Sequence, residues 1–166
     1  MSTSTHAAPP PRLARGGKYL TFLLEGEEYG IEILKVREII GMLPVTRVPR
    51  TPAFVRGVAN LRGKVIPIVD LRERFGMPRQ DTAESCIVVA QVGGVPLGVV
   101  VDRVSEVLTI GDADIEPTPD FGAHVETGLL IGLATGSGRV RILLDIDQVL
   151  TATEAEAMRA AERTGH

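Results

Sequence analysis

Residues 57–72, with the sequence GVANLRGKVIPIVDLR, constrain the fold more than any other stretch of this chain. Apolar residues rich in Val and Ile lie on both sides of segment 61–64, which reverses the chain direction, so a β-hairpin is predicted. Gly63 supplies the backbone freedom that such a turn needs. Asn60 and Arg62 place polar groups near its tip, within reach of a partner. None of these groups is a nucleophile, a metal ligand or a phosphate cradle, so the hairpin indicates recognition rather than chemistry.

The rest of the chain predicts many short strands and little helix. Strands are expected at 19–24, 29–32, 86–92, 95–101, 102–110, 129–134 and 140–144, with an extended segment at 45–48. Helical structure is expected as a short helix or turn over 33–40, as one turn from Thr51, at 71–75, and in a C-terminal helix from about 145 or 147 to 161. This order indicates small antiparallel barrels or a sandwich, and the polar stretch 79–85 allows two such units.

The 166 residues suffice for one compact domain or two small intimate ones. Residues 1–17 are polar and Pro-rich, which predicts a disordered N-terminal tail without a signal peptide. The folded domain is expected to span 18–153, and 154–166 should hold the end of the terminal helix and a short tail.

Composition excludes several classes of partner. The net charge of −3 argues against binding to nucleic acid through phosphate contacts. No apolar run is long enough to cross a bilayer, so no membrane insertion is expected. The single cysteine, Cys86, lies in an apolar run and is interpreted as a packing thiol. A reducing compartment, the cytoplasm, fits this cysteine usage.

Residue patterns for catalysis fail on inspection. Two of the three histidines, His6 and His166, lie near the chain ends, and His124 falls in a predicted loop. Asp145 and Asp147 are better explained as favouring the start of a helix than as a catalytic pair. No enzymatic activity, metal or cofactor is therefore expected.

Four segments, 28–39, 52–72, 98–104 and 143–147, resemble in order the CheW-like chemotaxis coupling proteins. The resemblance covers nearly all of 18–150. It implies a mainly β fold of two SH3-like five-stranded barrels that share an apolar core. It also implies a non-enzymatic adaptor between the cytoplasmic tip of methyl-accepting chemoreceptors and the regulatory domain of the histidine kinase CheA, with ring assembly in receptor arrays.

The resemblance also implies two binding faces. The receptor-binding residues would be Ile33, Val36, Glu38, Asn60, Leu61, Arg62 and Gly63. The kinase-binding residues would be Pro44, Val45, Thr46, Arg56 and Gly57, beside strands suited to edge-to-edge pairing with a similar barrel. A guanidinium on a turn suits an interface anchor, although Arg62 also fits a solvated turn residue. Gly57 equally fits a structural glycine, and Ile33 and Val36 fit plain core positions.

Three other readings remain open from the sequence. A coupling protein of the same fold could serve a CheA-type pathway outside flagellar chemotaxis, such as surface motility or gene regulation. The chain could be a fragment of a larger protein. A small-molecule-binding β-barrel would require a sizeable cavity with convergent polar groups.

Overall fold

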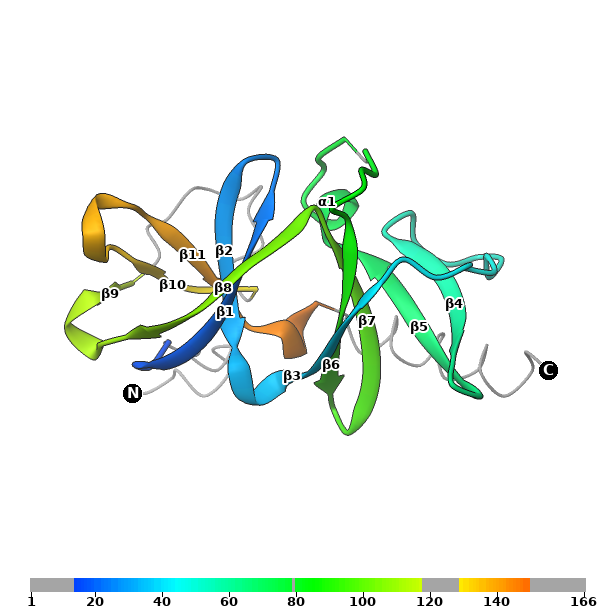
Figure 1. The fold of residues 1–166 in the computed structure, drawn as a ribbon, viewed down its shortest axis with the longest axis horizontal. Helices are drawn as coiled ribbons and strands as arrows, with labels where there is room; N and C mark the ends of the chain where they lie inside the picture. The colour runs from blue at the N-terminus through cyan, green and yellow to red at the C-terminus, as the bar shows by residue number, and fades with distance from the viewer. Residues whose placement is uncertain (1–13, 79, 118–128, 150–166) are drawn as a thin grey trace, which may run out of the picture.

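The computed structural model describes residues 14–78, 80–117 and 129–149, and within them the fold is mainly β, as predicted. A six-stranded sheet has the order β8 (Arg103–Ile110), β1 (Gly17–Leu24), β2 (Glu27–Glu32), β11 (Arg141–Leu144), β10 (Leu130–Ala134) and β9 (Ile115–Glu116). A five-stranded sheet has the order β3 (Val36–Gly41), β6 (Cys86–Val92), β7 (Val95–Val101), β5 (Lys64–Asp70) and β4 (Val55–Leu61). The two sheets lie side by side (Figure 1).

Helical structure within the described residues is short. The α-helix α1 spans Leu71–Arg74, and Asp70 caps its first turn by accepting a hydrogen bond from the Arg72 amide. Four 3-10 turns follow strands or precede them: Ile33–Lys35, Asp112–Asp114, Gly136–Gly138 and Ile146–Gln148. The predicted C-terminal helix lies mostly outside the described residues, but Asp145 caps the Ile146–Gln148 turn, as its predicted role at a helix start requires.

The chain interleaves the two sheets instead of completing one before the other. It begins with β1 and β2, builds the whole five-stranded sheet, and returns through β8 to complete the first sheet (Figure 1). Residues 80–85 connect α1 to β6 inside the five-stranded sheet, so this polar stretch does not separate the two units. The first sheet has six strands, one more than expected, because the two-residue β9 pairs with β10.

An apolar core shared by both sheets confirms that part of the predicted fold. Leu20, Phe22 and Leu24 of β1 pack in one buried cluster with Val88 and Val99 of the other sheet. A second cluster, including Ile66, Ile68, Ile87 and Val100, belongs to the five-stranded sheet alone. A third, including Tyr19, Ile110, Ile131 and Leu143, belongs to the six-stranded sheet. Burial of these apolar side chains is the main favourable term in folding.

Two helical predictions are only partly correct. Residues 33–40 form one 3-10 turn and then β3, because antiparallel pairing of Ile39 with Val88 and Ile40 with Ile87 outweighs the local helical spacing. Residues from Thr51 form a single turn, closed by the Val55 amide donating to the Pro52 carbonyl at 3.0 Å, and the chain continues as strand β4 instead of as a helix.

The N-terminal segment joins the six-stranded sheet before β1 begins. The Ala14 amide donates to the Ile131 carbonyl at 2.9 Å, and β1 already begins at Gly17. The remainder of the predicted tail, 1–13, and the segments 118–128 and 150–166 lie outside the described residues.

Candidate interaction surfaces

The tip of the β4–β5 hairpin presents Arg62 to solvent. Arg62 and Gly63 both have left-handed backbone angles, with φ of 51° and 89°, so they form the primed two-residue turn that suits a hairpin. Asn60 stiffens the turn because its side-chain oxygen accepts a hydrogen bond from the Gly63 amide at 2.8 Å. The Arg62 side chain remains 66% exposed. The predicted hairpin and its polar tip are therefore confirmed.

A charge pair joins the two edges of the five-stranded sheet. The Arg62 guanidinium donates to the carboxylate of Glu38, which lies on β3. Strands β3 and β4 are the opposite edge strands of that sheet, so the pair requires the sheet to curl toward a barrel. Residues far apart in strand order are thereby brought to one surface.

Beside this pair lies an open cavity of about 310 Å³, called here the hairpin cavity. Leu61 and Pro96, both half-buried, supply its apolar lining, and Ile66 and Val89 lie beneath in the core. The charged residues around it are Arg37, Glu38, Arg62 and Lys64, three cations and one carboxylate. The Arg37 guanidinium is held by the side-chain oxygen of Gln91 at 2.8 Å. Charge around the cavity is thus positive in a chain of net charge −3.

The residues predicted to bind a receptor divide into two groups. Glu38, Leu61 and Arg62 line the hairpin cavity, with Asn60 and Gly63 in the adjoining turn. Ile33 and Val36 are half-buried and pack against the core shared by the two sheets. These two therefore have the structural role that their spacing also allowed.

The segment 44–46 runs along the β4 edge. The Thr46 amide donates to the Val58 carbonyl at 2.8 Å, and the Val58 amide returns the bond to the Thr46 carbonyl at 2.9 Å. Pro44 and Thr46 are exposed, whereas Val45 packs against the five-stranded sheet's own cluster. Gly57 is buried directly beneath Thr46.

Arg56, the remaining residue predicted to bind a kinase, is turned inward. Its side chain is 5% exposed. Its Nε lies 3.3 Å from an Asp70 oxygen, and its Nη2 donates to both carboxylate oxygens of Asp81 at 3.0 Å. A guanidinium enclosed in this way is not available to anchor a partner.

Arg56 belongs to a buried charge network centred on Arg72. The Arg72 guanidinium donates to Asp70 at 2.9 and 2.8 Å, to Asp81 at 2.8 Å, to Asp102 at 3.0 Å and to the Gln80 carbonyl at 2.8 Å. The pKa of Arg72 is raised, mainly by its hydrogen bonds to Asp70, although burial acts in the opposite direction. Sequence reasoning missed this network because its members come from separate elements.

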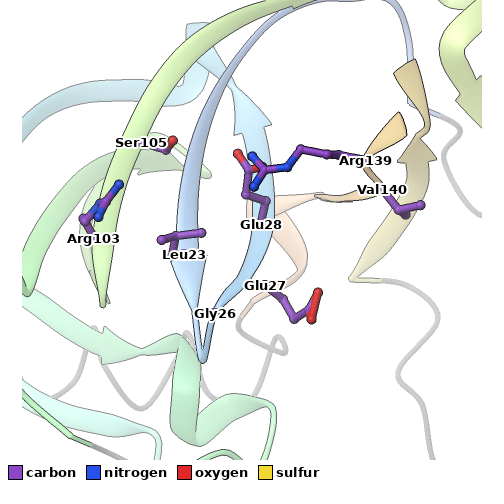
Figure 2. A pocket seen from close by; sticks show the side chains of 8 residues that line it. All are labelled: Leu23, Gly26, Glu27, Glu28, Arg103, Ser105, Arg139 and Val140. Carbon is purple, nitrogen blue, oxygen red and sulfur yellow. The ribbon is translucent and has the colours of Figure 1, made fainter. Parts of the chain in front are cut away.

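A second ion-pair cluster lines a cavity of about 350 Å³ on the six-stranded sheet (Figure 2). Glu28 of β2 is 8% exposed. Its carboxylate accepts from Arg139 Nη1 at 3.0 Å and from Arg141 Nε at 3.4 Å. In the close-up the Arg139 side chain reaches across to Glu28 (Figure 2). The cluster ties β2 to β11, and two arginines pair with its carboxylate.

Reactive groups are scarce in the described part of the chain. No group of three or more His, Cys, Asp or Glu side chains there is arranged to hold a metal ion. Burial raises the pKa of the Cys86 thiol, although a backbone hydrogen bond involving Val104 opposes this, so the unreactive thiol is favoured. The arrangement suits binding to other proteins.

Fold and surfaces together define a β-sheet module for protein recognition. A family model described as "CheW-like domain" matches residues 18–154, and the chain belongs to this family. Its members are non-enzymatic scaffolding or coupling proteins of chemotaxis signalling, which confirms the predicted class of function.

Known relatives agree with this assignment. "Chemotaxis protein CheW" of Rhizobium meliloti is 42% identical over 147 residues, which cover 87% of this chain and 95% of the relative. The protein of the same name in Klebsiella aerogenes is 43% identical over 140 residues and 84% of each chain. The crystal structure of "scaffolding protein TtCheW" from Thermoanaerobacter tengcongensis superposes with a TM-score of 0.77 at 33% identity, covering 84% of this chain and 95% of that one.

Proposed function

We propose that this chain joins the cytoplasmic tip of methyl-accepting chemoreceptors to the regulatory domain of a CheA-type histidine kinase. It acts in the cytoplasm, is recruited to membrane-associated receptor arrays, and assembles with the regulatory domain into rings. Among the described residues, no helix is long and apolar enough to span a membrane. In this proposal the receptor provides the attachment to the membrane.

The observation that carries the proposal is the Arg62–Glu38 pair beside the open hairpin cavity. The pair holds the Arg62 guanidinium in one orientation while most of its side chain stays exposed. A guanidinium that is already oriented loses less conformational entropy on binding, which favours affinity. This is the receptor-binding face of the proposal.

The chemistry of the hairpin cavity specifies the partner further. Its apolar lining, with Leu61 and Pro96, accepts an apolar side chain, and the cations around it favour carboxylates. A receptor tip segment with an apolar residue flanked by Asp or Glu meets both requirements. Such a segment would also be attracted at long range despite the negative net charge of the whole chain.

The kinase-binding face is the segment 44–46. It is anchored from below by Val45 and along the β4 edge by the paired hydrogen bonds of Thr46 with Val58. Pro44 and Thr46 remain exposed and available to a partner. A regulatory domain of similar fold can approach this edge with a matching edge of its own.

Both faces belong to the five-stranded sheet. An adaptor influences a kinase only through its differential affinity for the kinase and receptor arrangements. A rigid body with one face for each partner supplies that coupling by favouring arrangements in which both faces are occupied.

The test is a pull-down of the chain from lysate of its own cells, with retained proteins identified by mass spectrometry. The proposal predicts recovery of both a CheA-type kinase and a methyl-accepting receptor. The genes beside the recovered kinase distinguish flagellar chemotaxis from another CheA-type pathway. Failure to retain either protein, from cells that express both, would contradict the proposal.

A further inference from the structure

We infer that Arg56 and Asp81 are positioning residues for the kinase-binding segment 44–46, acting through the backbone of β4 without touching the partner. The inference rests on the proposed function for the identity of that face. Neither residue's role is that of an interface contact.

Strand β4 contains a bulge. The β4–β5 register pairs Val55 with Val69 but Gly57 with Ile68, so Arg56 is the extra residue of the bulge. The bulge directs the Arg56 side chain into the protein, where it is 5% exposed. The backbone after the bulge then follows the position of the Arg56 guanidinium.

The backbone after the bulge is in contact with segment 44–46. Val58 exchanges two hydrogen bonds with Thr46, at 2.8 and 2.9 Å. Gly57 allows Thr46 to approach its backbone closely. Movement of the bulge would therefore move Thr46 and the exposed Pro44 near it.

The carboxylates of Asp70 and Asp81 hold the Arg56 side chain. Its Nε lies near Asp70 but makes no hydrogen bond within the described residues. From Nη2, Arg56 donates hydrogen bonds to both carboxylate oxygens of Asp81. Asp81 thus orients the guanidinium together with the Asp70 carboxylate, and a neutral side chain at position 81 would weaken a charge-assisted interaction.

Asp81 is itself partly exposed. Its side chain is 42% exposed, whereas that of Arg56 is almost fully covered. The same carboxylate also accepts from Arg72 at 2.8 Å. Asp81 is therefore the point at which the surface loop 80–84 meets the buried network beneath the kinase-binding face.

The experiment compares Asp81→Asn with the matched control Glu84→Gln. Glu84 lies in the same loop and has an exposed partner, Arg103, at 3.7 Å, outside the network. Three quantities are measured for each variant: the Kd for the kinase regulatory domain, the Kd for a receptor tip fragment, and the hydrogen-exchange rate of the Val58 amide. Asp81→Asn is expected to raise the kinase Kd at least fivefold, leave the receptor Kd within twofold, and speed exchange at Val58. Glu84→Gln should change none of the three.

A second variant keeps the inference falsifiable. Arg56→Lys keeps the charge but cannot donate two bonds from one fixed plane, so it should reproduce the selective loss of kinase affinity. An unchanged kinase Kd in Asp81→Asn, or an equal loss of both affinities, would overturn the inference. If the wild-type chain bound no kinase domain, the proposed function would fail, and unchanged Val58 exchange in Asp81→Asn would separately refute the positioning role.

Discussion

A Cβ atom added to Gly57 would lie 2.0 Å from the carbonyl oxygen of Thr46. The Gly57 backbone also has a φ of +137°, which side chains resist. The close approach lets the Thr46 carbonyl accept its bond from Val58. Gly57 therefore supports the segment 44–46 from below, the structural role that its sequence position left open.

Gly57→Ala should destabilise the fold. The new methyl group must displace the Thr46 backbone and tolerate an unfavourable φ, at a cost of at least about 2 kcal/mol. Urea denaturation gives the free energy of unfolding. Gly111→Ala is the matched control, because nothing lies within 4 Å of the Cβ position at that exposed glycine. A Gly57→Ala protein of wild-type stability that failed to bind kinase would instead identify Gly57 as a contact residue.

Arg62→Gly should separate stability from receptor binding. Arg62 has a φ of 51°, which glycine adopts more easily, and an exposed ion pair contributes at most about 1 kcal/mol. The free energy of unfolding should stay constant or rise by up to about 1 kcal/mol. The Kd for a receptor tip fragment, measured by calorimetry, should rise at least tenfold. Arg62→Glu, which brings a second carboxylate beside Glu38, should lose binding in the same way without losing the fold.

An Arg62→Gly variant that lost stability but still bound the receptor would contradict the assignment of Arg62 as a receptor contact. Arg62 would then be part of the hairpin's structure, and the hairpin cavity would not be the receptor-binding face.

Glu28→Gln should be the most damaging of these variants to the six-stranded sheet. It leaves the buried guanidinium of Arg141 without its carboxylate, and breaking a buried ion pair costs about 3–5 kcal/mol. Glu27→Gln removes the same charge from the exposed neighbouring position and should shift stability by less than about 0.5 kcal/mol. Equal denaturation midpoints for the two variants would show that the Glu28 cluster does not stabilise the sheet.

Stability should depend on pH through Asp81. Burial would raise the pKa of Asp81, but hydrogen bonds from Arg72 and Arg56 outweigh it and hold that pKa below its ordinary value of 3.8. The ionised group therefore stabilises the fold above that ordinary value, and the contribution is lost as pH falls through the lower, folded-state pKa.

The measurement is the difference in unfolding free energy between wild type and Asp81→Asn from pH 7 to pH 2.5. It should be constant down to about pH 5 and shrink as pH falls below about 4, because only the wild-type carboxyl titrates. A difference that grew at low pH would mean that the Asp81 pKa is raised.

Local patterns predicted the hairpins well. The β4–β5 hairpin and the β6–β7 hairpin each combine strand-forming residues with a turn whose glycines accept positive φ, so neighbouring residues determine both. The exposed position of Arg62 followed from the same turn. By contrast, β3 depends on pairing with β6, which lies far along the chain, and local spacing there favoured a helix.

Side-chain contacts between distant segments were beyond the reach of the sequence. Arg56 was predicted to contact the kinase, but its enclosure depends on Asp81, 25 residues away. The Glu28–Arg141 pair joins residues 113 apart, and nothing in either local sequence indicates it. A charged residue in a predicted strand is expected to be exposed, because charged side chains are rarely buried unless a partner of opposite charge lies next to them. The sequence does not show which carboxylates lie next to Arg56.

We expect this chain to bind a receptor and a kinase at the same time. Sedimentation velocity of the purified chain, a receptor tip fragment and a CheA-type regulatory domain measures this directly. The account predicts binary complexes with each partner and a larger species that contains all three. Displacement of one partner by the other, or sedimentation of the chain alone in the presence of both, would contradict it.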